Sequence, residues 1–116
     1  MILCAIDDLM FSIKVSTAAK SLQADVYFER SGDKLLETIR EKRPSLVIFD
    51  LNSARLRPLD AIAALKRDPE LSGTRTLGYV AHVDTATIEA ARAAGVDQVL
   101  ARSAFVDRLG EILTTA

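Results

Sequence analysis

The chain has 116 residues, of which 49% are apolar and 27% charged, and its formal net charge is -1. This length suffices for one compact domain with a buried core, and the balanced charge argues against a surface for nucleic acid or an anionic membrane. The one cysteine, Cys4, excludes an internal disulfide framework, and the start MILCAIDD lacks the basic segment of a signal peptide. We therefore expect a cytoplasmic protein with no membrane-spanning segment.

The first half of the chain alternates short apolar runs with segments of helical periodicity. A continuous apolar run predicts a buried strand at residues 2–6, and apolar residues at steps of three and four predict a helix over 11–22. Residues 24–29 read as a shorter strand. Polar residues at 31–33 offer a turn and an N-cap for a second helix, which must end before Pro44.

The clearest buried strand runs from Leu46 to Phe49 and ends at Asp50. An irregular stretch follows, and Pro58 is placed to begin a third helix. The rest of the chain predicts strands at 77–81 and 96–101, a helix capped at residue 84 or 85 and ended by Gly95, and one closing amphipathic helix over 105–113.

Five strand–helix units in succession indicate an α/β fold. The economical arrangement is a doubly wound, five-stranded parallel sheet of order 2-1-3-4-5, a flavodoxin-like (βα)5 sandwich. A (β/α)8 barrel needs roughly twice this length. We expect residues 1–116 to form a single domain with no output domain, and a functional crevice at the carboxyl ends of the first and third strands.

Acidic residues follow both of these strands. Asp7 and Asp8 come after the first strand and Asp50 ends the third, so three carboxylates converge at one edge of the predicted sheet. Any one of them alone is more typical of a helix N-cap than of a ligand. Together, their hard oxygen atoms suit Mg²⁺, and the trio favours a metal or phosphoryl site.

With these residues the whole sequence resembles the response-regulator receiver domains (CheY-like) of two-component signalling. Asp7 and Asp8 resemble the acidic pair of that family, and Asp50, within VIFDLN, resembles its phosphoacceptor. Asn52 falls where the family binds metal through a backbone carbonyl. The segment GVDQVL at 95–100 is similar to the family's GADDYL.

The resemblance implies a stand-alone receiver in a phosphorelay that accepts a phosphoryl group on Asp50 with the help of Mg²⁺. It implies no enzyme beyond self-phosphorylation and dephosphorylation. Its partners would be a sensor histidine kinase or phosphotransfer protein and a downstream protein target. The fourth helix, fifth strand and fifth helix would form a surface for that target or for a homodimer.

Several positions depart from the receiver pattern. Val80 stands where the family has a Ser or Thr, Val99 replaces the aromatic switch residue, and Arg102-Ser103 replaces Lys-Pro. Valine has the shape of threonine but cannot donate a hydrogen bond, and Arg presents a planar fork in place of a point charge. These departures leave open the path of residues 102–105. They also leave open an alternative function, a pseudo-receiver that binds partners independently of phosphorylation.

Other chemistries have less support. Asp7-Asp8 would repel the phosphate of a flavin, and Asn52 stands where an Asp-nucleophile hydrolase needs its second acid. Arg55 and Arg57 would attract a phosphorylated partner, although a solvated loop is the commoner reason for such residues. His82 has no paired acid or nucleophile in the sequence, which is typical of a solvated histidine.

Overall fold

Five parallel strands form the centre of the molecule in the order β2-β1-β3-β4-β5. The computed structural model describes residues 1–81 and 84–116, so His82, the histidine near the predicted site, lies outside the described residues. The predicted fold class and strand order are confirmed. The strands are β1 (Ile2–Ala5), β2 (Val26–Phe28), β3 (Leu46–Asp50), β4 (Arg75–Val80) and β5 (Gln98–Ala101).

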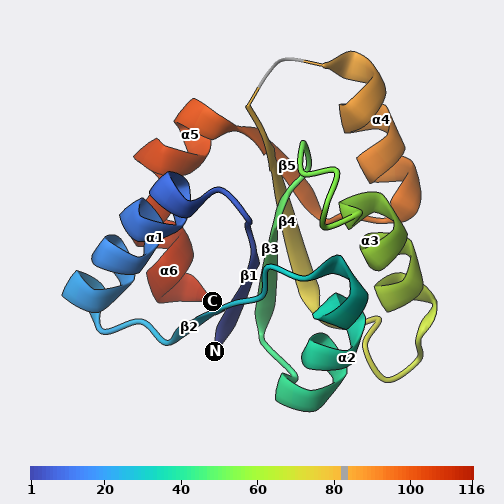
Figure 1. Ribbon diagram of the computed structural model, residues 1–116, viewed down its shortest axis with the longest axis horizontal. Helices are drawn as coiled ribbons and strands as arrows, with labels where there is room; N and C mark the ends of the chain where they lie inside the picture. The colour runs from blue at the N-terminus through green and yellow to red at the C-terminus, as the bar shows by residue number, and fades with distance from the viewer. Residues whose placement is uncertain (82–83) are drawn as a thin grey trace.

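Helices cover both faces of this sheet (Figure 1). They are α1 (Leu9–Leu22), α2 (Gly32–Lys42), α3 (Pro58–Arg67), α4 (Thr85–Ala94), α5 (Arg102–Asp107) and α6 (Leu109–Thr115). Figure 1 shows α1, α5 and α6 on one side and α2, α3 and α4 on the other. Alternate strand residues point to opposite faces. Cys4 therefore packs under α1, α5 and α6, whereas Leu3 packs under α2, α3 and α4, which gives two apolar cores.

The helix ends follow the polar signals of the sequence. Asp8 caps α1, because its Oδ1 accepts a hydrogen bond from the Phe11 amide at 3.1 Å. Asp84 caps α4 in the same way, through the amides of Ala86 and Thr87. Gly95 ends α4 with φ of 108°, a left-handed conformation that favours glycine.

The prediction of one closing helix is wrong. The segment divides into α5 and α6 at Arg108, where φ is −100° and ψ is 8°. Backbone hydrogen bonds nevertheless run from Arg108 N to Ala104 O and from Ile112 N to Arg108 O, so the interruption is local. The apolar stripe that predicted the helix remains buried across it, at Phe105, Leu109, Ile112 and Leu113.

The fourth strand begins two residues earlier than predicted. Thr76 is buried in β4, and its amide and hydroxyl both donate to Asp97 Oδ2, at 2.8 and 3.0 Å. The Asp97 amide donates to the Thr76 hydroxyl in return, at 3.0 Å. This reciprocal pairing lets a polar residue occupy a buried strand position that sequence pattern assigns to a loop.

No helix in the described ranges 1–81 and 84–116 is both long and apolar enough to cross a membrane.

Candidate functional site

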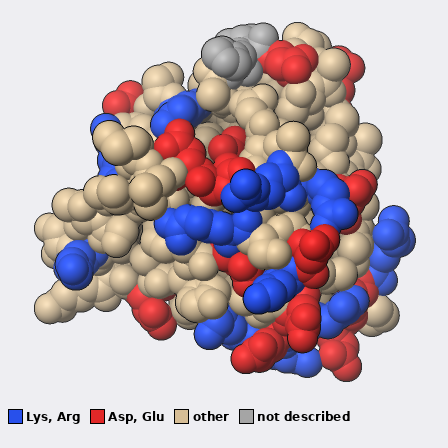
Figure 2. Space-filling model, viewed as in Figure 1, with Lys and Arg blue, Asp and Glu red and all other residues tan. Residues whose placement is uncertain are grey.

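The acidic residues lie at one edge of the sheet, where β1 and β3 end. These two strands are direct neighbours, with Ala5 paired to Phe49. Asp50 is the last residue of β3 and is half-buried, Asp7 is half-buried after β1, and Asp8 is exposed at the start of α1. On the face in Figure 2, acidic side chains gather beside a band of Lys and Arg side chains.

Asp50 lies in a setting that opposes its ionisation. Burial raises its pKa above the ordinary value, and the negative charges of Asp7 and Asp8 raise it further. The Asn52 amide, which donates to Asp50 Oδ1 at 3.0 Å, and the Arg102 guanidinium act in the opposite direction. The structure thus places Asp7, Asp8 and Arg102 close enough to Asp50 to affect the pKa of its carboxyl group.

Asp8 has two partners already. Its Oδ1 caps α1, and its Oδ2 lies 3.6 Å from Arg102 Nη2. The Ser12 hydroxyl also donates to the Asp8 carbonyl, at 2.8 Å, which secures the first turn of the helix. The sequence alternative of an N-cap is therefore correct for Asp8, and it holds whether or not the carboxylate has a second role.

Arg102 is the first residue of α5 and points toward α1. Its guanidinium carbon lies 4.1 Å from the centre of the Phe11 ring, a cation–π contact that fixes the side chain beside Asp8. The path of residues 102–105, left open by the sequence, is helical throughout. The chain passes from β5 straight into α5, so Ser103, predicted from the sequence to align with the proline of receiver domains, lies inside the first turn of a helix.

Asn52 makes a contact that sequence reasoning missed. Its side-chain Oδ1 accepts a hydrogen bond from the Ala81 amide at 2.7 Å, just beyond β4. Asn52 therefore ties the loop after β3 to the end of β4, while its own amide orients Asp50. Its backbone carbonyl was the atom predicted to bind metal, and these two hydrogen bonds use other atoms of the residue.

Val80 and Val99, at the predicted switch positions, belong to the core under α2, α3 and α4. Val80 is buried at the end of β4, where it pairs with Ala101, and Val99 packs half-buried against the same cluster. Neither side chain has a group that can donate a hydrogen bond to Asp50. The structure thus supplies apolar packing at these two positions.

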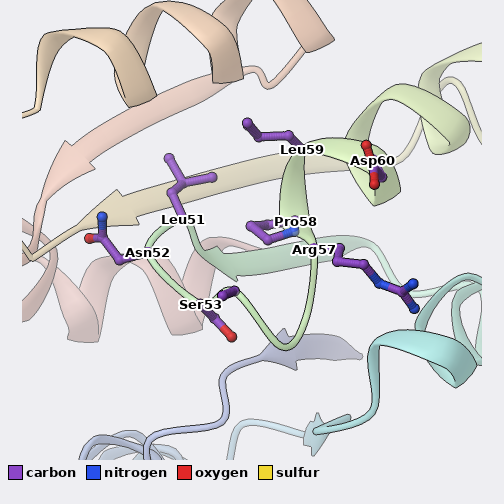
Figure 3. A pocket seen from close by; sticks show the side chains of 8 residues that line it. Leu51, Asn52, Ser53, Arg57, Pro58, Leu59 and Asp60 are labelled. Atoms are coloured by element: carbon purple, nitrogen blue, oxygen red, sulfur yellow. The ribbon is translucent and has the colours of Figure 1, made fainter.

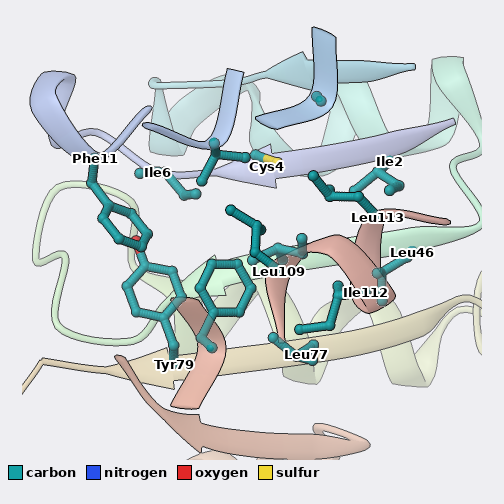
Figure 4. Close-up of a cluster of buried hydrophobic side chains, with 14 residues drawn as sticks. Ile2, Cys4, Ile6, Phe11, Leu46, Leu77, Tyr79, Leu109, Ile112 and Leu113 are labelled. Atoms are coloured by element: carbon teal, nitrogen blue, oxygen red, sulfur yellow. The ribbon is translucent and has the colours of Figure 1, made fainter. Parts of the chain in front are cut away.

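Tyr79 is a strand residue, as its sequence context predicts, and its side chain is buried in the core. Its ring centre lies 5.0 Å from those of Phe11 and Phe105 in one aromatic cluster (Figure 4). Within the part of the chain that the structure describes, its buried hydroxyl has no hydrogen-bond partner. Burial, followed by the charge of Asp50, strongly raises the pKa of this hydroxyl, so it stays protonated. Phe11 and Phe105 each belong to an apolar helical stripe in the sequence, and these stripes were the available signal for the cluster.

A pocket of about 290 Å³ lies beside this edge, against the loop between β3 and α3. Figure 3 shows its lining side chains, which run from Leu51 and Asn52 on one side to Leu59 and Asp60 on the other. Pro58, at the start of α3, and Leu51 are both among the lining residues. The pocket therefore adjoins Asp50 through the two residues that follow it in the chain.

The donor atoms at this edge suit a hard divalent cation, because they are carboxylate and carbonyl oxygens. The residues therefore fit a divalent cation in the type of their donor atoms. Among residues 1–81 and 84–116, no group of three or more His, Cys, Asp or Glu side chains is close enough together to hold a metal ion. Asp8 faces Arg102 and its own helix instead.

Several solved structures with this architecture are response regulators. The Mn²⁺-bound form of response regulator Rcp1 matches with a TM-score of 0.82 and 18% identity over 99% of this chain and 95% of that one. A response regulator from Hahella chejuensis matches with a TM-score of 0.87 and 17% identity, covering 97% and 91%. The fold is that of receiver domains. The phosphorylated cyanobacterial phytochrome response regulator RcpA also shares the receiver fold, with a TM-score of 0.77 and 20% identity over 97% and 86% of the two chains.

Comparison by sequence alone finds no match: no family model matches this chain, and no curated protein does. At identities of 17–20% the structural likeness establishes the receiver fold. The function of the acidic edge therefore has to be argued from its own residues.

Proposed function

We propose that this chain is a receiver domain that accepts a phosphoryl group on Asp50 and signals through protein contacts. The observation that carries the proposal is the half-buried Asp50 carboxylate, which ends β3 at the edge where Asp7 and Asp8 follow β1. A receiver fold presents its functional groups at this switch point between the first and third strands. Its partners would be a sensor histidine kinase or phosphotransfer protein and a downstream target.

The transfer uses a carboxylate that the protein has already oriented. The Asn52 amide holds Oδ1 of Asp50, which leaves Oδ2 to attack phosphorus. A new O–P bond forms as the bond from phosphorus to the donor breaks, and the donor leaves with that electron pair. The product is an acyl phosphate. Such transfers depend mainly on positioning and on stabilisation of negative charge.

Two sources of positive charge serve this edge. Asp7, Asp50 and the Asn52 backbone carbonyl would hold Mg²⁺, with Asp8 as a further ligand once its carboxylate leaves Arg102, and the ion would supply charge neutralisation on the transferring group. The Mn²⁺-bound form of Rcp1 and the phosphorylated form of RcpA support this assignment. Arg102 stands at the family's lysine position and is close enough to lower the pKa of Asp50. It would add a second positive charge.

Apolar side chains on α1 offer a docking surface beside the acidic edge. Leu9, Met10 and Ile13 are 63%, 77% and 53% exposed, in the first turns of the helix that Asp8 caps. Exposed large apolar side chains grouped in this way are typical of a protein interaction surface. A phosphodonor protein that covers them would bring its phosphoryl group next to Asp50.

One observation favours a second function, the pseudo-receiver that binds partners without phosphorylation. Val80 is buried in the core and has no hydroxyl that would respond to a phosphoryl group. Arg102 is engaged with Asp8 and Phe11, so it already has partners in the unphosphorylated protein. A module of this kind would bind its partner equally well with Asp50 replaced by alanine.

Intact-protein mass spectrometry after incubation with acetyl phosphate tests the first function. We expect the mass to increase by one phosphoryl group only when Mg²⁺ is present. This adduct should be labile in acid, and it should be absent from Asp50→Asn. The matched control is Glu89→Gln, at an exposed position of α4, and this variant must still be phosphorylated. No mass increase in the wild type, or the same increase in Asp50→Asn, would contradict the proposal and favour the pseudo-receiver.

A further inference from the structure

Three arginines line a second pocket. It has a volume of about 360 Å³ and lies between the β2–α2 connection and the loop that follows β3. Its lining consists of Arg30, Ser31, Gly32, Asp33, Arg55 and Arg57. These residues come from two segments more than twenty positions apart in the chain, so the fold itself assembles the pocket.

The lining carries an excess of positive charge. Arg57 forms an ion pair with Asp33, which neutralises one cation. In the described ranges, neither Arg30 nor Arg55 is within ion-pair distance of a carboxylate. Arg30 instead lies over the Phe28 ring, with its guanidinium carbon 5.4 Å from the ring centre. For a chain of net charge -1, this is a local concentration of unneutralised guanidinium groups.

Hydrogen bonds fix the β2–α2 side of the pocket. The Glu29 carboxylate accepts from the Ser31 amide at 3.2 Å and from the Thr38 hydroxyl at 2.7 Å. The Glu29 amide in turn donates to the Cys4 carbonyl in β1, at 3.1 Å. Arg30 and Ser31 are therefore held by the sheet and by α2, which limits the entropy lost when a ligand binds.

Gly32 joins the two sides. A Cβ atom at this position would lie 2.5 Å from the Arg55 carbonyl oxygen, which is closer than real Cβ contacts allow. Only glycine permits the Arg55 loop to pack this tightly on the first residue of α2. On the Arg55 side, the buried Leu56 anchors the loop and its amide donates to the Ser53 hydroxyl at 3.2 Å.

The pocket also contains unused backbone donors. Ser31 occupies the N-cap position of α2, but its side chain makes no capping hydrogen bond. The amides of a first helical turn lack the usual partners four residues back, and they carry the positive end of the helix dipole. In α2 the Lys34 amide donates to the Ser31 carbonyl at 3.2 Å, which leaves the amides of Gly32 and Asp33 as the donors for a ligand. Gly32 and Asp33, the first two residues of α2, line the pocket together with the three arginines.

We propose that this pocket binds the phosphate group of a small phosphate monoester. One guanidinium group can bind two phosphate oxygens at once through two parallel N–H donors, and helix amides add donors for the remaining oxygens. The volume suits a phosphate with a small organic group, since ligand pockets start at about 300 Å³. The site is distinct from Asp50 and goes beyond the receiver function, because it needs neither metal nor phosphoryl transfer.

Titration with inorganic phosphate and with glycerol 3-phosphate, followed by amide NMR and calorimetry, tests the proposal. The experiment omits Mg²⁺ and includes Asp50→Asn, so that the acidic edge contributes nothing. We expect amide shifts centred on Gly32 and Asp33, unchanged in Asp50→Asn. Arg30→Gln and Arg55→Gln should each weaken binding about tenfold, in line with the loss of a charged hydrogen bond. Arg92→Gln, on exposed α4, is the matched control and should change Kd less than about twofold.

Three results would overturn the proposal. These are equal weakening by all three arginine variants, shifts that spread over the surface and vanish at a physiological ionic strength of about 0.15 M, and no shift at Gly32 with either probe. A phosphoserine peptide that binds more tightly than both probes would overturn the assignment to a small molecule. Gly32→Ala gives a second route to the answer, because it separates the two sides of the pocket and retains every charge. It should weaken binding in protein that circular dichroism shows to be folded.

Discussion

Arg102 Nη2 lies 3.6 Å from Asp8 Oδ2, and this contact joins the first residue of α5 to the residue that caps α1. The side chains are 39% and 42% exposed, so the pair is partly solvated. Arg102 is also held against the Phe11 ring at 4.1 Å. Its cation therefore neutralises one of the carboxylates that would bind metal, and it lies near Asp50 without an ion pair to it.

Replacing Arg102 by glutamine should change the pKa of Asp50 and the affinity of the acidic edge for Mg²⁺. Without the guanidinium, the pKa of Asp50 should rise further, because Arg102 lowers it in the folded protein. A divalent cation at the acidic edge would lose a repelling neighbour, so Mg²⁺ should bind about threefold more tightly, the size expected for a half-exposed charge pair. Carboxyl NMR titration of Asp50 and a Mg²⁺ titration measure the two effects.

Arg92→Gln removes an equivalent charge from α4 and should leave both quantities unchanged. If Arg102→Gln leaves the pKa of Asp50 where it is in the wild type, the charge of Arg102 does not act on Asp50. If Mg²⁺ binds more weakly in Arg102→Gln, Arg102 positions the metal ligands and does not compete with the metal.

Asp50→Asn should stabilise the protein at neutral pH. The folded-state pKa of Asp50 is raised above its ordinary value of 3.8, mainly by burial. For such a group the favourable contribution is complete below the ordinary pKa and is lost as pH rises through the folded pKa. At neutral pH the ionised carboxylate therefore costs stability, and asparagine removes this cost.

Urea unfolding of wild type and Asp50→Asn across the range from pH 5 to pH 8 checks this expectation. The advantage of the variant should shrink as the pH falls toward the pKa of Asp50. Added Mg²⁺ should stabilise only the wild type. Glu89→Gln provides the control for removal of an exposed acid, and an advantage of Asp50→Asn that is the same at every pH would contradict the burial argument.

The fold was predictable because its signals are local. Residues 46–49 are a run of apolar residues that is buried in the structure, and Asp8, Asp84 and Gly95 mark helix ends as their residue types predict. Five strand–helix units of this length leave few ways to cover both faces of a parallel sheet. The convergence of the strand ends follows from the strand order alone.

The partners of each side chain were not predictable, because they depend on distances across the sheet. The pairing of Arg102 with Asp8 joins residues that no periodicity relates. The Thr76–Asp97 hydrogen bonds extend β4 into a polar stretch, and Arg108 leaves helical geometry inside an uninterrupted apolar stripe. In each case a tertiary contact or a single backbone angle decides the outcome.

Tyr79→Phe should stabilise the protein. The Tyr79 hydroxyl is buried in an aromatic cluster and has no hydrogen-bond partner in the described part of the chain, so folding removes it from water without replacement. Deleting it should raise the free energy of unfolding by about 1 kcal/mol, the low end of the cost of an unsatisfied buried polar group. Tyr27→Phe, at a 41% exposed position, should have no measurable effect. A Tyr79→Phe variant that is less stable than wild type would show that the hydroxyl is hydrogen-bonded in solution.

Gly78→Ala should destabilise the sheet next to Asp50. A Cβ at position 78 would lie 2.6 Å from Leu51 Cδ1, and Leu51 is buried directly after Asp50, with its amide bonded to the Tyr79 carbonyl. Overpacking of this kind costs about 1–3 kcal/mol. Gly73→Ala has open space around its Cβ and is the control, with unfolding free energy near that of the wild type.

The double variant Gly78→Ala with Leu51→Ala identifies the cause. Leu51→Ala alone leaves a cavity and should cost about 2–5 kcal/mol. In the double variant the new methyl group at position 78 enters this space, so the two losses should sum to more than the loss measured for the pair. Strict additivity of the two losses in urea unfolding would show that the strain at position 78 falls on atoms other than the Leu51 side chain.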